Sequence, residues 1–403
     1  LSIHRIMMAT TSSNDQRDPL QVDWTEDSDR VHQGQWTADV QEAYDPILMV
    51  SPWTPPAWMK DNKNKRGGGV LLPEYYDDYA RFVSQYIRGI KEHYDVDIDV
   101  HSFQNEPGKK SWAACEWPED TAQVFLRDYL VPQLIEDGLL SADPSQPGEI
   151  MLMADEETRW TDRPLNRLLK DEELGPHIDI AAAHPYGGGN YPTRTFDTAR
   201  EMGKRVWQTE FYNKGNEGHA TDTIEYGLMI ARIMHNFMIN NDVNVYNYWW
   251  IADSEPSGRD RDSQSLIQYY NEDDTYKIQK QGYVFGQFSR FIRPGYHRIA
   301  NTNPFPQLGA GVTEPIDKSV TLGVSAYTNA TGNRLVVVAI NDSADTETID
   351  LTINNADGSI QDLDAWRTSA TENMEPIHPV SVTDDVATLS LPPYSITTYV
   401  GGN

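Results

Sequence analysis

Two glutamates stand at the ends of apolar segments that have the composition of buried strands. Glu106 follows Ser102–Asn105, and Glu210 lies within Val206–Tyr212, each beside amide or aromatic side chains. Retaining hydrolysis of a glycosidic bond needs two carboxyl groups about 5–5.5 Å apart, one protonated to assist the leaving oxygen and one ionised to attack the anomeric carbon. Because parallel strands in a barrel end at one rim, where active sites lie, the two glutamates predict this chemistry.

Several further polar residues at strand ends are expected to serve the carboxylates. Asn105 is placed to donate a hydrogen bond to a sugar 2-hydroxyl, an interaction that strengthens in the transition state. Arg5 and Tyr186 are expected to keep an attacking carboxylate ionised. His184 fits a hydrogen-bonded buried histidine better than a catalyst, and Glu156 competes for the catalytic role because Met151–Ala154 delivers it to the same rim.

Aromatic residues gather after the predicted strands, as in sugar sites, where rings stack on the apolar face of a pyranose. They are Trp53, Trp58, Trp112, Trp117, Tyr186, Tyr191, Tyr212, Trp249 and Trp250. An acid must stay protonated to assist the leaving group, so Glu106 is expected to have an apolar wall, supplied by Trp112 or Trp117.

Strand and helix patterns alternate through the first three quarters of the chain. Seven buried strands are predicted at 1–9, 46–50, 98–105, 149–155, 178–184, 205–211 and 243–250, with helices at 73–94, 118–138, 161–173, 193–203, 222–240 and 277–292. This alternation is typical of an α/β fold with parallel strands wrapped by helices. An eight-stranded barrel of the (β/α)8 type would require one more strand, ahead of Leu1.

After Arg293-Pro294-Gly295 the pattern changes to short β runs separated by turn residues. Runs at 319–327, 334–340, 346–353, 359–368 and 386–400 predict an antiparallel β-sandwich. We therefore expect a catalytic barrel over residues 1–293, lacking its first strand, and a β-sandwich side domain over residues 294–403.

Composition limits the partners. The 403 residues carry a formal net charge of −28, which disfavours nucleic acid and anionic membranes as ligands. Few lysines and many acids fit a salt-adapted surface, although an ordinary acidic protein fits equally well. A single cysteine, Cys115, excludes an intrachain disulfide, and no metal-ligand spacing or phosphate-binding motif is present. We expect a monomer with no cofactor and no metal, acting on a polysaccharide.

Five segments in order resemble glycoside hydrolase family 30. They are Ser51–Lys60, Gln104–Pro107, His184–Gly187, Trp207–Glu210 and Gly282–Gly295. The resemblance implies a retaining glycosidase with a barrel and a β-sandwich, in which Glu106 is the acid/base and Glu210 is the nucleophile. It places Trp53, Asn105, Tyr186 and Trp249 in the subsite of cleavage and Arg5 beneath the nucleophile, and we add Trp112, His184, Tyr212 and Trp250 as expected substrate contacts.

Cys115–Pro118 and the pair Trp249-Trp250 are most similar to the xylanase branch of that family, which implies an endo-β-1,4-xylanase. Members specific for glucuronoxylan carry an arginine soon after the tryptophan pair, whereas here Ile251–Glu255 follows. A requirement for a glucuronate branch is therefore not expected, although Arg259 or Arg261 could reach in from the long loop. A β-1,6-glucanase or β-1,6-galactanase and a carbohydrate-binding protein without turnover are the alternatives. The resemblance also implies an extracellular protein, longer at its start and preceded by a secretion signal.

Overall fold

The computed structural model describes residues 2–8, 29–110, 112–186, 195–212, 221–254, 264–299, 320–353 and 360–402. These residues divide into two compact units, which are considered separately. The first contains a parallel sheet with its helices, and the second contains two helices and all the antiparallel strands.

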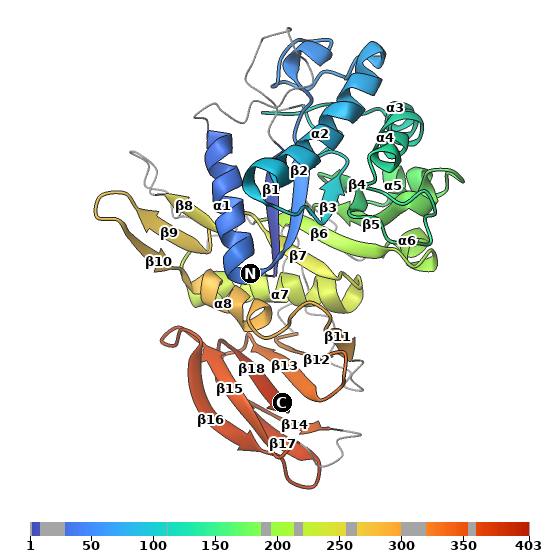
Figure 1. Ribbon diagram of the computed structural model, residues 1–403. Helices are drawn as coiled ribbons and strands as arrows, with labels where there is room; N and C mark the ends of the chain where they lie inside the picture. Colours follow the sequence, from blue (N-terminus) through green and yellow to red (C-terminus); the bar gives the residue numbers. More distant parts are fainter. Residues whose placement is uncertain are drawn as a thin grey trace. The chain divides into compact units, whose positions relative to one another are not determined.

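Seven strands in chain order form the sheet of the first unit (Figure 1). They are β1 (Ile3–Met8), β2 (Ile47–Pro52), β3 (Val100–Ser102), β4 (Met151–Glu157), β5 (Ile178–Ala183), β6 (Arg205–Phe211) and β7 (Val245–Tyr248). The pairs from β1 to β6 are parallel. Strands covered on both faces are apolar throughout, which is why the sequence pattern located all seven. The predicted α/β barrel architecture is confirmed.

The interior of the sheet is an apolar cluster to which five neighbouring strands contribute. Met49, Val100, Met153, Ile180, Ala182 and Trp207 are buried there. Since successive side chains of a strand alternate between faces, the other face is left to pack against helices. The result is a packed barrel core that fixes where the strand ends lie.

Helices α1 (Asp29–Tyr44), α2 (Tyr76–Tyr94), α3 (Glu119–Phe125), α4 (Val131–Glu136), α5 (Arg163–Leu169) and α6 (Asp197–Glu201) belong to this unit. Short 3-10 turns lie at Ala57–Met59, Pro73–Tyr75 and Gly175–His177. The helix predicted at 118–138 is divided by a π turn at Leu126–Leu130. Pro132 follows this turn and lacks the N–H that an unbroken α-helix would use, which accounts for the irregularity.

A buried lysine anchors the loop between β2 and α2. The Lys60 amine donates to the backbone carbonyls of Asn64 (2.8 Å) and Ala114 (2.6 Å), and so joins this loop to the one after β3. Burial lowers the pKa of the Lys60 amine. Cys115 is buried beside it, and burial raises the pKa of its thiol to about 12, so this cysteine lacks the thiolate that reactivity needs.

The second unit combines α7 (Ile224–Asn240) and α8 (Lys280–Ser289) with three antiparallel or mixed sheets (Figure 1). A small sheet has the order β10 (Thr275–Ile278), β9 (Ile267–Tyr270), β8 (Ala252–Ser254). The larger sheet has the order β11 (His297–Ile299), β12 (Leu322–Thr328), β13 (Arg334–Asn341), β18 (Ser395–Gly402), β15 (Asp362–Thr368), β16 (Glu375–Ser381). A two-stranded sheet pairs β14 (Glu347–Thr352) with β17 (Val386–Leu391).

One apolar core joins these last two sheets. Val337, Ala365 and Tyr399 of the larger sheet are buried with Ala387 and Leu389 of β17. The predicted antiparallel sandwich is therefore confirmed, although the single run expected at 386–400 is two strands, because Pro392-Pro393 cannot donate ladder hydrogen bonds. Strands β8, β9, β10, β11 and β16 were not predicted. The domain limits at 293 and 294 stay a prediction.

No helix among the described residues has the length and apolar character needed to cross a bilayer.

Candidate active site

Glu106 has a backbone conformation that is held from two neighbouring strands. It follows β3 with φ at +48°, in the left-handed region, which costs a non-glycine residue on the order of 1–3 kcal/mol. Its N–H donates to the carbonyl of Glu156 (3.0 Å), and the N–H of Asn105 donates to the carbonyl of Pro52 (2.8 Å). Bonds to β2 and to the end of β4 thus offset the strain and fix the carboxyl group at the rim.

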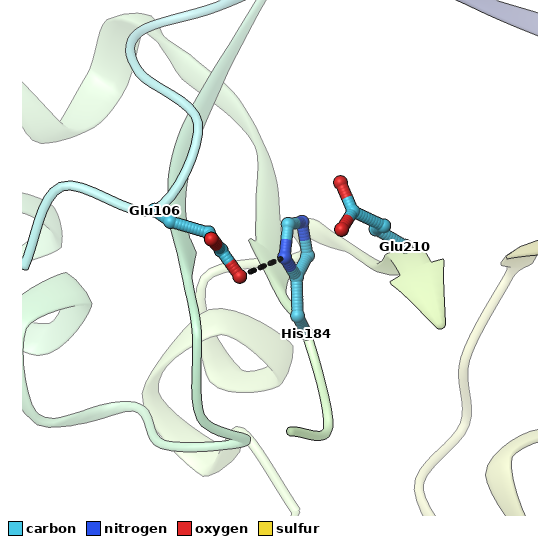
Figure 2. Close-up of side chains that lie close together, drawn as sticks. All are labelled: Glu106, His184 and Glu210. Atoms are coloured by element: carbon cyan, nitrogen blue, oxygen red, sulfur yellow. Dashed lines mark hydrogen bonds and ion pairs between the residues drawn. The ribbon is translucent and has the colours of Figure 1, made fainter. Parts of the chain in front are cut away.

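The two predicted catalytic glutamates lie face to face, with His184 between them (Figure 2). One oxygen of Glu106, one oxygen of Glu210 and one ring nitrogen of His184 all lie within 4.8 Å of one another. This fits the spacing of about 5–5.5 Å used by retaining glycosidases, and is shorter than the about 6.5–9.5 Å that inverting enzymes need to hold a water. All three side chains are buried.

Glu210 accepts bonds from two of the residues expected to serve it. Arg5 donates from Nη1 to Oε2 (2.8 Å), and the Tyr186 hydroxyl donates to Oε1 (3.2 Å). Arg5 also donates from Nη2 to Oδ1 of Asn105 (2.6 Å), and its guanidinium lies 4.6 Å from the ring centroid of Trp53. Because the amide oxygen of Asn105 is occupied, its NH2 group is the part left to donate to a sugar hydroxyl.

The surroundings of Glu106 differ from the expected apolar wall. Burial raises the pKa of its carboxyl, but His184 and the ion-paired Lys109 outweigh that effect and lower the pKa below its usual value. Trp112 is 56% exposed. Trp117 stacks among other rings and donates from its indole N–H to Gln104 (3.2 Å). The prediction of an apolar wall is wrong: cationic groups face Glu106.

Glu156, the rival carboxylate, is fully buried and is surrounded by donors. Its Oε2 accepts from the hydroxyls of Ser51 (2.7 Å) and Ser102 (2.5 Å), and its Oε1 lies 3.0 Å from Nη2 of Arg5. Burial raises its pKa, but Arg5, His184 and Ser102 outweigh burial and lower the pKa to about 2. Enclosed on all sides, this group has no access to a substrate and is not a catalytic acid.

Lys109 is the residue near the carboxylates that the sequence interpretation missed. It stands three positions after Glu106, a spacing at which a cation can fold back onto an acid. The neighbouring lysine, Lys110, instead pairs with Glu116 (2.8 Å). Their spacing in the sequence does not distinguish them, because the fold of the loop decides which lysine faces Glu106.

Glu106, His184 and Glu210 have the donor types of a metal site. A histidine must be neutral to ligate a metal. Burial lowers the pKa of His184, but Glu210, Glu106 and Glu156 outweigh it and raise the pKa to about 9. The three side chains therefore form an ion-pair network, from which a metal ion would have to displace the ring proton.

Tyr212, Trp249 and Trp250 belong to the second unit. The rings of Tyr212 and Trp250 are 6.3 Å apart, those of Trp249 and Trp250 are 5.3 Å apart, and Trp250 is 41% exposed. Their contacts with substrate stay predictions, as does that of Trp112. Tyr191, Arg259 and Arg261 lie outside the described residues.

A parallel barrel that presents paired glutamates, an asparagine and a supporting arginine at its rim defines a glycoside hydrolase. The sequence model of glycosyl hydrolase family 59 matches residues 9–270, more than half of the chain, and the chain belongs to that family.

Relatives confirm the resemblance to family 30. The chain is 26% identical over 386 residues to the glucuronoxylanase XynC of Bacillus subtilis, covering 92% of this chain and 79% of the relative. A solved family 30 subfamily 8 xylanase, Xyn30A from Clostridium acetobutylicum, is 26% identical, with a TM-score of 0.78 and coverage of 100% and 89%. The catalytic domain of a family 30 xylanase C from Talaromyces cellulolyticus shares the fold, at 22% identity, a TM-score of 0.80 and coverage of 100% and 88%.

Proposed function

We propose that this protein is an endo-β-1,4-xylanase that hydrolyses its substrate by double displacement, with Glu106 as acid/base and Glu210 as nucleophile. The observation that carries the proposal is the approach of the two carboxylates to within 4.8 Å. Xylan as the substrate rests on the relatives named xylanase or glucuronoxylanase.

The surroundings of Glu210 suit attack, and those of Glu106 suit the second half of its role. Two donors, Arg5 and Tyr186, bond the two oxygens of Glu210 and orient its carboxyl group for attack on the anomeric carbon. Glu106 protonates the departing glycosidic oxygen and then, as a carboxylate, takes a proton from the water that releases the sugar. The cations that face Glu106 stabilise this second, ionised form.

Product analysis tests the proposal. The protein is incubated with xylan, pustulan and arabinogalactan, and the products are separated by size, while the anomer formed first is identified by NMR. We expect a ladder of xylo-oligosaccharides with the β-anomer appearing first. Cleavage of pustulan or arabinogalactan without cleavage of xylan would show that the substrate is β-1,6-linked and not xylan. The α-anomer appearing first would refute double displacement.

Two variants test the roles of the carboxylates. We expect Glu106→Gln and Glu210→Gln each to lower turnover by a factor of about 10²–10⁴ while both still bind xylo-oligosaccharides. Glu157→Gln is the matched control, because this half-buried glutamate ends β4 and its Oε1 accepts from the N–H of Thr158 (2.8 Å). Binding of xylan by the unaltered protein without any product would indicate the carbohydrate-binding alternative.

We also propose that the protein acts outside the cell, as a monomer. The physical basis is the substrate, since a polysaccharide is too large to enter the cell. Detection of the protein and of xylan-degrading activity in the culture medium tests the location, and sedimentation tests the oligomeric state.

A further inference from the structure

Glu156 contacts side chains from three other strands of the barrel and from the residue that follows a fourth. Arg5 of β1, Ser51 of β2 and Ser102 of β3 direct donors at it, and His184, which follows β5, faces it from the other side. Its own position at the end of β4 places it in the middle of this row. Such a fully enclosed anion is expensive to bury unless charged and hydrogen-bonding partners surround it.

The geometry of His184 shows what the buried anion does for its neighbours. Nδ1 lies 3.4 Å from Oε1 of Glu106, and Nε2 lies 3.5 Å from Oε1 of Glu156. The Nδ1 contact is a hydrogen bond and the Nε2 contact is an ion-pair approach. Because a carboxylate faces each ring nitrogen and carboxylates attract positive charge, the surroundings favour the imidazolium. His184 is therefore a buried cation between two anions, one catalytic and one not.

We propose that Glu156 is a positioning residue, whose carboxylate holds His184 as an imidazolium against Glu106 and holds Arg5 against Glu210. This inference rests on the proposed function, since it assigns to Glu156 a part in the same reaction. The pair of Glu106 and His184 shares the proton that the first step consumes. In that step the N–H bond at Nδ1 breaks and the proton reaches the glycosidic oxygen through Glu106. In the second step Glu106 takes a proton from water and the imidazolium is restored.

The charges around the two groups support this assignment. The groups that act on His184 are Glu106, Glu156 and Glu210, with the ring of Tyr186 5.9 Å away. Glu156 in turn is faced by Arg5 and His184, with the buried, neutral His101 also within its field. Burial alone would keep His184 neutral at pH 7, but the three carboxylates together raise its pKa to about 9.

The test is Glu156→Gln, which keeps the shape of the side chain and removes its charge. His184 is followed by NMR titration of its imidazole, which requires no substrate. We expect its pKa to fall by about 1–3 units, as for loss of one nearby opposite charge. The apparent pKa of the alkaline limb of kcat/KM on xylo-oligosaccharides should fall by a similar amount. Glu157→Gln, which removes a charge from the next residue, should change neither.

Further variants keep the test decisive. In Glu156→Asp the charge is kept, so the His184 pKa should lie between its values in the unaltered protein and in Glu156→Gln. If Glu156→Gln does not fold, Glu156→Asp keeps the charge but withdraws it from Nε2 of His184, and the His184 pKa and the alkaline limb should then fall by a smaller amount. A folded Glu156→Gln protein, or Glu156→Asp in its place, with an unchanged His184 titration and pH profile would overturn the inference. Full turnover by Glu106→Gln would instead refute the proposed function, whatever Glu156 does.

Discussion

Lys109 offers the sharpest test of how the acid/base is tuned. Its ammonium pairs with Oε2 of the nearly buried Glu106, while the lysine side chain itself is 40% exposed. Replacement by methionine keeps the length of the chain and removes the charge. An anionic Glu106 then loses a stabilising partner, so the shared proton of Glu106 and His184 is held more tightly.

The size of the effect follows from the exposure of the lysine. Because water reaches it, the attraction between the two charges is that of a water-like medium, about 1 kcal/mol at about 4 Å. One pKa unit corresponds to about 1.4 kcal/mol. The apparent pKa of the alkaline limb of kcat/KM should therefore be higher by about 0.7 unit in Lys109→Met. A full unit or more would require a dry contact, which the exposure of Lys109 excludes.

The assay is a pH profile of kcat/KM on xylo-oligosaccharides, which reports the protonation of the free enzyme. Lys110→Met is the matched control, since this adjacent lysine is 74% exposed and pairs with Glu116 instead. The control profile should coincide with that of the unaltered protein. An alkaline limb in Lys109→Met that stays in place or moves down would refute the electrostatic account of Glu106.

Three further predictions concern stability. The folded-state pKa of Glu156 lies near 2 against an ordinary value of 4.5. Its contribution to the free energy of unfolding, about 3 kcal/mol, is therefore present above pH 4.5 and lost as pH falls toward 2. Urea unfolding of Glu156→Gln at a series of pH values should lack that part of the acid dependence. Leu389→Ala leaves a cavity in the sandwich core and should cost about 2–5 kcal/mol by chemical denaturation, whereas the exposed Tyr394→Ala should cost far less. Because the chain carries a net charge of −28, added NaCl should raise Tm by screening repulsion, and a highest Tm at low ionic strength would contradict this.

The barrel was predictable because buried parallel strands leave an unambiguous apolar pattern. All seven strands were located, and the positions of Glu106 and Glu210 at strand ends followed from them. The sandwich was less complete: β16, with two prolines and mostly exposed residues, carries little strand signal. The sequence also separates Arg5 and Asn105 by a hundred positions, and their bond depends on strand order rather than on any local motif.

The electrostatics of the site could not be predicted in the same way. In the sequence, Glu156 is one of several acids at the ends of strands. Its enclosure depends on hydroxyls that β2 and β3 supply. The expected apolar wall failed for the same reason, since the fold of the loop after β3 turns Lys109 toward Glu106 and leaves Trp112 exposed.

The enclosed amine of Lys60 makes this loop region observable by chemistry. The two carbonyls that it bonds belong to two different loops, and Lys60 is fully buried between them. An acylating reagent should therefore modify the exposed lysines at once and Lys60 only when the two loops separate. The rate at which label appears on Lys60, followed by mass spectrometry, would measure how often these two loops open.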